Sequence, residues 1–184
     1  AHAQRRTAAN GLSAVRARNL AQDAGCAVGA IYNVFGDLTD LVLAVNARTF
    51  ESLGVAVSDV LLDAPSDAVE QLVIMSQAYH HFAAEHHNLW RAMFDVGRPA
   101  TETAPDWHLR EMGQLMAHFA APLSMIFPLL GEQDLELMTH ALFSSVHGIV
   151  LLALDETASG APTAEIDRMI SLVLRQLSAS APNS

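Results

Sequence analysis

The sequence contains no lysine, so all ten basic residues are arginines, set against twenty aspartates and glutamates for a formal net charge of -10. It contains one cysteine, Cys26, which excludes an intramolecular disulfide framework and is typical of a reducing compartment. No run of about 18 apolar residues is free of charged or turn-forming residues, and no signal-peptide pattern stands at the start. We therefore expect a cytoplasmic protein without a membrane partner.

Motifs for catalysis are also lacking. The sequence has no nucleophile elbow, no phosphate-cradling glycine loop and no paired metal-binding motif, and its acids are spread along the polar faces of the predicted helices. We interpret Cys26, in a predicted turn, as a small buried residue rather than a nucleophile. We expect no enzymatic activity, no cofactor and no bound metal, with an all-helical enzyme as a distant alternative.

Strand signals are missing, because runs that alternate apolar and polar residues do not occur. Apolar residues recur instead at helical spacing, which predicts an all-α fold without an internal repeat. Helices are expected over 1–9, 38–62, 86–96, 132–156 and 164–177, and from Ser66 or Asp67 to 85. Asp37 is expected to cap the helix at 38–62. A further helix is capped by Asp106, and Pro122 starts or kinks its next turn. Residues 97–105 predict a loop.

Residues 15–35 predict two short helices joined by a tight turn. Leu20 and its apolar neighbours form one face up to Gly25, which tolerates the left-handed conformation that often ends a helix. Tyr32 and Phe35 lie on the second helix, which spans only about two turns and depends on packing against its neighbours. This arrangement predicts a helix-turn-helix, whose second helix enters the major groove of DNA.

Charge is distributed unevenly along the chain. Residues 1–53 contain five arginines and four acids, a balance of +1, whereas the remainder contains five arginines and sixteen acids, a balance of -11. An acidic body repels DNA at long range, so only the N-terminal part is expected to approach phosphates. Such binding should weaken as salt rises.

The helix-turn-helix resembles that of the TetR family of bacterial transcriptional regulators. The resemblance covers about the first 50 residues and rests on Leu20-Ala21, Ala24-Gly25-Cys26, the run from Gly29 to Phe35, Asp37 and Leu41. A later segment, FSSVHG at 143–148, is similar to the His-Gly segment of one ligand-domain subgroup of that family, which usually has tryptophan where Phe143 stands.

The resemblance implies two domains. A helix-turn-helix DNA-binding domain would occupy residues 1–46, with an incomplete first helix, and a long helix would join it to an effector-binding and dimerisation domain at 47–184. The helices expected at 132–156 and 164–177 would form the homodimer interface, and their apolar stripes favour such pairing independently.

The candidate DNA-binding residues come from chemistry and from the resemblance. Tyr32 and Asn33 can donate to a phosphate or a base edge, and Arg16 and Arg18 can reach the backbone. The resemblance adds three exposed positions of the recognition helix, Ala27, Val28 and Ala30.

The sequence departs from the family at two of its DNA-contacting positions. Ala27 replaces the common capping serine or threonine, and Leu38 replaces the common phosphate-binding lysine. Both departures reduce the contacts that the family makes with DNA.

A candidate effector pocket follows from the flat and flexible side chains in the middle of the chain. These residues are also typical of plain core, but the family holds a small effector between its middle helices. The candidates are Phe82, Trp90, Met93, Phe94, Trp107, Met112, Met116, Phe119 and His147. His147 could supply one polar contact there, or could lie at a tight helix crossing beside Gly148.

Four of the nine histidines cluster in the segment YHHFAAEHH, at 79–87. No acid or cysteine completes a metal-ligand set by spacing, so the cluster predicts a polar helix face. Its imidazoles could still sense pH.

These features predict an effector-responsive transcriptional regulator, most simply a repressor. It would bind a near-palindromic operator in double-stranded DNA as a homodimer and be released by a small apolar ligand. The alternative is a helical ligand-binding or scaffold protein that has lost DNA binding, which the apolar recognition face, Leu38 and the acidic total all favour.

Overall fold

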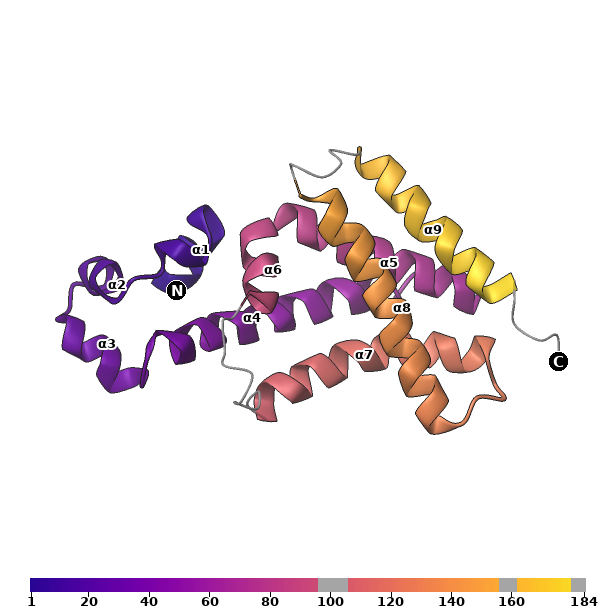
Figure 1. The fold of residues 1–184 in the computed structure, drawn as a ribbon, viewed down its shortest axis with the longest axis horizontal. Coiled ribbons are helices and arrows are strands. Elements are labelled where there is room, and N and C mark those ends of the chain that lie inside the picture. Colours follow the sequence, from indigo (N-terminus) through magenta and orange to yellow (C-terminus); the bar gives the residue numbers. More distant parts are fainter. Residues whose placement is uncertain (96–105, 156–161, 180–184) are drawn as a thin grey trace. The chain divides into compact units, whose positions relative to one another are not determined.

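The computed structural model describes residues 1–95, 106–155 and 162–179, and these residues form helices without a strand. The all-α prediction is therefore confirmed. In chain order the elements are α1 (His2–Asn10), the 3-10 helix η1 (Leu12–Ala14), α2 (Ala17–Ala24), α3 (Val28–Val34), α4 (Leu38–Asp59), α5 (Ala68–Glu85), α6 (His87–Phe94), α7 (Asp106–Ile126), α8 (Glu132–Ala153) and α9 (Thr163–Ala179) (Figure 1). The loop predicted over 97–105 lies outside the described residues.

The observed helices agree closely with the predicted ones, with differences at their ends. α4 ends at Asp59, before the predicted end at 62, because the chain turns there. α7 begins at Asp106 itself and continues through Pro122 to Ile126. Pro122 therefore does not start a new helix; its fixed φ is compatible with the helical backbone, and it removes one backbone hydrogen bond.

The chain forms two compact units. We call Ala1–Ser52 with Glu85–Glu111 the head unit, and Leu53–Ala84 with Met112–Ser184 the body unit. α4 and α7 contribute residues to both. The functional boundary proposed between residues 46 and 47 lies within α4, and the sequence did not indicate that α6 folds with the N-terminal helices.

Local backbone chemistry sets the helix ends in the head unit. Gly25 ends α2 in the left-handed conformation at φ 65°, as predicted. Asp37 precedes α4, and its Oδ1 accepts the N–H of Asp40 at 2.8 Å, which confirms the predicted cap. The prediction of a buried Cys26 is wrong, because the turn after Gly25 leaves this side chain exposed.

A small apolar core holds the head helices together. Val15, Leu20 and Leu41 are buried, with Ile31 and Phe35 packed against them. Val15 precedes α2, Leu20 lies in α2, Ile31 lies in α3, Phe35 ends α3 and Leu41 lies in α4, so the core joins all of these elements. The packing orients α3, which is too short to be stable alone.

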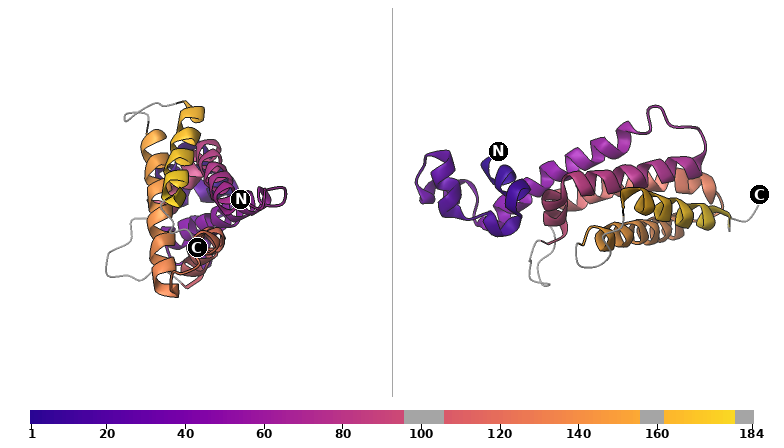
Figure 2. Two further views of the ribbon diagram at one scale, coloured as in Figure 1. Left: turned by 90° about the vertical axis from the view of Figure 1, so that its right-hand side faces the viewer. Right: turned by 90° about the horizontal axis from the view of Figure 1, so that it is seen from above.

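The body unit has a larger core. Its buried apolar residues include Leu53, Val57, Leu72, Met75, Tyr79, Phe82, Phe119, Leu123, Phe143, Val146, Val150, Ile166, Ile170 and Leu174. α8 and α9 contact each other and lie side by side (Figures 1 and 2). α5 begins as predicted after Asp67, whose Oδ1 accepts the N–H of Glu70 at 2.9 Å.

Among the residues that the structure describes, two helices, α4 and α8, are long and apolar enough to cross a membrane by length and composition alone. The core helix of a soluble protein passes the same test. In α4, 44% of the apolar window is buried within the protein, against 28% in α8. α8 buries Leu142, Phe143, Val146 and Val150 and leaves Leu137 and Leu152 exposed.

Candidate functional site

All seven candidate DNA-binding residues are exposed along α2, the turn and α3. Arg16 and Arg18 lie at the start of α2, and Ala27 directly precedes α3. The other four, Val28, Ala30, Tyr32 and Asn33, lie on α3 itself. The seven exposed residues thus come from two short segments, the start of α2 and the stretch from Ala27 to Asn33, with the buried Leu20 and Ala21 between them.

α3 has one face toward the head core and one toward solvent. Ile31 is only half-buried against the core, and no residue of α3 is fully buried. Val28 and Tyr32 are 40% and 46% exposed, so Tyr32 is not a sealed packing residue. Val34, at 74%, is a further exposed apolar residue that the sequence reasoning did not single out.

The two departures from the family pattern have visible local consequences. Ala27 occupies the N-cap position of α3, where its side chain makes no capping hydrogen bond. A capping serine or threonine contributes about 1 kcal/mol at such a position, so α3 begins without that support. Leu38 starts α4 half-buried and offers no charge to a phosphate.

An ion pair that the sequence reasoning missed joins α1 to α2. The Arg6 guanidinium donates to the Asp23 carboxylate at 2.5 and 2.7 Å. This hydrogen bonding raises the pKa of Arg6 and lowers the pKa of Asp23. Within the described residues neither Arg16 nor Arg18 is ion-paired, so these two arginines keep their charge available to a phosphate.

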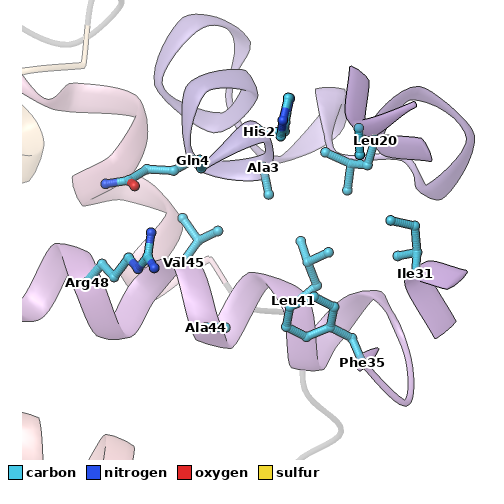
Figure 3. Close-up of a pocket in the computed structure, with 12 residues that line it drawn as sticks. His2, Ala3, Gln4, Leu20, Ile31, Phe35, Leu41, Ala44, Val45 and Arg48 are labelled. Carbon is cyan, nitrogen blue, oxygen red and sulfur yellow. The ribbon is translucent and has the colours of Figure 1, made fainter. Parts of the chain in front are cut away.

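A pocket lies in the head unit, between the first turn of α1 and the helices α2, α3 and α4 (Figure 3). Its lining is largely apolar, with Leu20 on one side of the space, Leu41 and Val45 of α4 on the opposite side, and Arg48 at one end. None of the predicted effector-pocket residues lines it. It adjoins the head core, with which it shares Leu20 and Leu41.

The body unit contains a cluster of four rings. Phe143 makes edge contacts with Tyr79 and Phe119, at centroid distances of 5.3 and 5.8 Å, and stacks on His147 at 6.0 Å. The hydroxyl of Tyr79 and Nδ1 of His147 are 2.7 Å apart. Burial lowers the pKa of His147, which favours the neutral imidazole, and a neutral ring can accept the phenol hydrogen on Nδ1.

The predicted pocket residues divide between the two units. Phe82, Met112, Met116, Phe119 and His147 lie in the body unit, whereas Trp90, Met93, Phe94 and Trp107 lie in the head unit. Through Phe143 the structure brings Phe119 and His147 together. Sequence reasoning missed Tyr79 as the partner of His147.

α6 is tied to the rest of the head unit by two asparagines. Asn88 of α6 donates to the carbonyl of Ala8 in α1 at 2.9 Å. Asn46 of α4, which is fully buried, donates to the carbonyl of Ala92 in α6 at 2.8 Å. No spacing pattern indicated these contacts, because their partners lie far apart in the sequence.

The histidine segment does not act as one cluster. His80 and His81 both approach the carboxylate of Asp167 on α9, which is the acid that local spacing did not supply. His86 and His87 lie at the start of α6 in the head unit. His87 is near Trp90, at a ring-centroid distance of 6.2 Å.

The model of the tetracycline repressor-like C-terminal domain matches residues 72–177, which is more than half of the chain. The chain belongs to the TetR family. This confirms the resemblance drawn from the sequence, and the matched range includes the FSSVHG segment. The family is one of transcriptional regulators, which sets the general class of this chain.

Solved structures share the TetR-family fold over nearly the whole chain. A protein of unknown function from Rhodococcus sp. RHA1 is 23% identical with a TM-score of 0.76, covering 95% of this chain and 90% of that one. The TetR family transcriptional regulator PfmR from Thermus thermophilus is 17% identical with a TM-score of 0.62, covering 89% of each chain. The protein SCO4313 is 17% identical with a TM-score of 0.70, covering 94% and 91%. No curated protein matches the chain.

Proposed function

We propose that this TetR-family chain is a cytoplasmic, effector-responsive repressor that binds a near-palindromic operator in double-stranded DNA as a homodimer. The exposed face of α3, preceded by two exposed arginines at the start of α2, is the observation that carries the proposal. The same observation supports a division of the chain into two functional domains. Residues 1–46 would bind DNA, and residues 47–184 would bind the effector and form the dimer.

The exposed groups suit both kinds of contact that duplex DNA offers. Arg16 and Arg18 supply charge for phosphates, which positions a protein without reading sequence. Tyr32 and Asn33 carry donors for a phosphate or a base edge. The small apolar side chains of α3 suit contact with thymine methyl groups, so direct readout by this face is limited and affinity depends strongly on phosphate contacts.

A second copy of the chain is the partner proposed for α8 and α9. Exposed large apolar residues gather on these helices: Leu137, Leu152, Met169, Leu172 and Val173 are 45% to 68% exposed. Pairing α8 and α9 with their symmetry mates would bury these residues in a four-helix interface. The two recognition helices would then lie about 34–36 Å apart, one turn of DNA.

The proposed effector is a small, mostly apolar molecule bound among the rings of the body unit. Phe119 and the neighbouring rings suit apolar contact, and neutral His147 suits one hydrogen bond. Release from DNA requires that the effector bind one conformation more tightly than the other. We propose α4, which contributes to both units, as the lever that carries the change.

The DNA part of the proposal is tested by fluorescence anisotropy on a duplex from the region upstream of the chain's own gene. We expect the logarithm of the binding constant to fall linearly with the logarithm of the salt concentration. Each phosphate contact that a substitution removes should make this slope shallower by about 0.9. Arg16→Ala removes one contact from each protomer, so the slope for the dimer should become shallower by about 2. Arg110→Ala removes an exposed arginine from α7 and serves as the matched control. Tyr32→Phe removes only the hydroxyl, whereas Tyr32→Ala removes the ring as well. The difference in DNA affinity between the two variants therefore shows which group contributes to binding.

Absence of salt-dependent binding in the parent protein would favour the alternative, a helical ligand-binding protein. The missing cap at Ala27 and the uncharged Leu38 are the observations on its side. Effector release is tested separately, by titrating small apolar compounds into the DNA complex. If the compounds bind the protein but leave its DNA affinity unchanged, the release mechanism is contradicted. The proposal of DNA binding is not affected by that result.

A further inference from the structure

One carboxylate in the body unit lies between two imidazoles. Oδ1 of Asp167, on α9, is 2.8 Å from Nδ1 of His80, and its Oδ2 is 2.9 Å from Nε2 of His81. The two histidines are consecutive on α5, more than eighty residues earlier in the sequence. Their rings are 5.3 Å apart between centroids, at 52°. Two nitrogens and a carboxylate thus converge from two helices.

The spacing of these atoms is close to that of a metal-ligand set. The three ligand atoms lie within 4.8 Å of one another. Around a four-coordinate zinc ion with bonds of about 2.0–2.1 Å, neighbouring ligand atoms are about 3.3 Å apart. The distance from Nδ1 of His80 to Oδ1 of Asp167 needs to open by about half an ångström, and no pair among the three ligand atoms needs to close by more than about 1.5 Å.

Burial makes the arrangement closed on one side and open on the other. The side chain of His80 is fully buried, that of Asp167 is 23% exposed and that of His81 is 55% exposed. An ion can therefore enter from the side of His81. A fourth position on that side would be open to water, as it is at metal sites with three protein ligands.

The ring of His80 is held by one polar contact. Its Nε2 is buried and has no hydrogen-bond partner among the described residues. Its Nδ1 faces the Asp167 carboxylate at 2.8 Å, and Nδ1 is the atom that an ion between the two side chains would meet.

The backbone that carries Asp167 is itself held in place. The hydroxyl of Ser171 donates to the Asp167 carbonyl at 2.8 Å, and Gln77 of α5 donates to the Ser171 hydroxyl at 3.2 Å. These contacts fix the turn of α9 that bears the carboxylate against the helix that bears the imidazoles.

We propose that His80, His81 and Asp167 form a binding site for a divalent transition-metal ion of the zinc class, with water in the remaining position. Two imidazoles and one carboxylate suit zinc and its neighbours rather than calcium or magnesium, which prefer oxygen ligands. The bound ion would join α5 to α9. The site rests on its own geometry and is independent of the proposed DNA binding.

The test is titration of zinc chloride into the chelator-treated full chain, followed by calorimetry and by thermal unfolding. We expect one ion per chain, and a rise in Tm of roughly 5–10 °C when free zinc is about a hundredfold above Kd. His81→Ala removes an exposed ligand without disturbing the core, and Asp167→Asn keeps the shape of the side chain. Each should weaken binding at least about tenfold and reduce the rise in Tm.

His140→Ala is the matched control, since it removes an exposed histidine of α8 and should leave zinc binding unchanged. Circular dichroism of each variant verifies that it is folded. Undiminished zinc binding in folded His81→Ala and Asp167→Asn would overturn the proposal. So would a parent protein whose Tm does not respond to millimolar zinc, because Asp167 would then serve only to clamp two helices.

Discussion

α3 of the head unit and α9 of the body unit both expose apolar residues, yet they are held in different ways. No residue of α3 is fully buried. α9 buries Ile166, Ile170 and Leu174 to 2% or less and leaves Leu172 54% exposed. α9 is thus secured by its own chain and leaves a second apolar face exposed. α3 depends on neighbours that bury it only in part, and its outer face adds polar groups suited to DNA.

The contrast between the two faces of α9 gives the largest expected effect on stability. Ile170→Ala removes a fully buried side chain and should lower the free energy of unfolding by about 2–5 kcal/mol. Leu172→Ala lies on the same helix but on the exposed face, and should cost little in the isolated protomer. Urea unfolding at low protein concentration measures both.

Raising the protein concentration sharpens this comparison. If α8 and α9 pair with their symmetry mates, Leu172→Ala weakens the dimer and its effect grows with concentration. Sedimentation or light scattering should show a shift toward monomer for Leu172→Ala. Equal losses for the two variants at every concentration would contradict the division of α9 into an inner and an outer face.

The head unit offers a comparison between two asparagines that make the same kind of bond at different depths. Asn46→Ala leaves the carbonyl of Ala92 without its donor in the interior, which should cost about 1–3 kcal/mol. Asn88→Ala breaks a bond at the surface, where water replaces the donor, and should cost about 0.5 kcal/mol. Thermal unfolding compares them, and a larger loss for Asn88→Ala would contradict the assigned burial.

Two glycines on either side of the turn respond oppositely to one added methyl group. Gly25 has φ 65°, so Gly25→Ala strains the end of α2 and should destabilise the head by about 1 kcal/mol. Gly29 lies within α3, and a Cβ there meets nothing within 4 Å. Gly29→Ala should therefore stabilise the protein by up to about 1 kcal/mol. A stabilising Gly25→Ala would show that the turn has another conformation.

The sequence predicted what depends on local chemistry. Helical spacing located the helices, and the cap at Asp37 and the left-handed Gly25 followed from residue type. The approach of Asp167 to two histidines, the pairing of Tyr79 with His147 and the bond from Asn46 to α6 join distant segments. No periodicity encodes such contacts, because they depend on how the helices pack. The same limit applies to Cys26, whose exposure is set by the shape of the turn.

The ring cluster supplies the smallest expected effect, a dependence of body-unit stability on pH. Burial lowers the pKa of His147 below its unfolded value of about 6.5, so the unfolded chain binds this proton more readily than the folded one. The contribution to stability is therefore intact above about pH 6.5 and is lost as the pH falls toward and through the folded pKa. The slope stays below about 1.4 kcal/mol per pH unit, the limit for one proton.

His147→Gln should reduce this slope, because glutamine does not titrate and can still reach Tyr79. The measurement is urea unfolding of the parent and the variant at intervals between about pH 7.5 and 5, on either side of the unfolded pKa. His140→Gln is the control, since it removes an exposed imidazole from the same helix and should leave the slope unchanged. Equal slopes in the parent and His147→Gln would mean that the ring cluster tolerates a charged imidazole, and the cluster would then suit a polar or anionic effector rather than an apolar one.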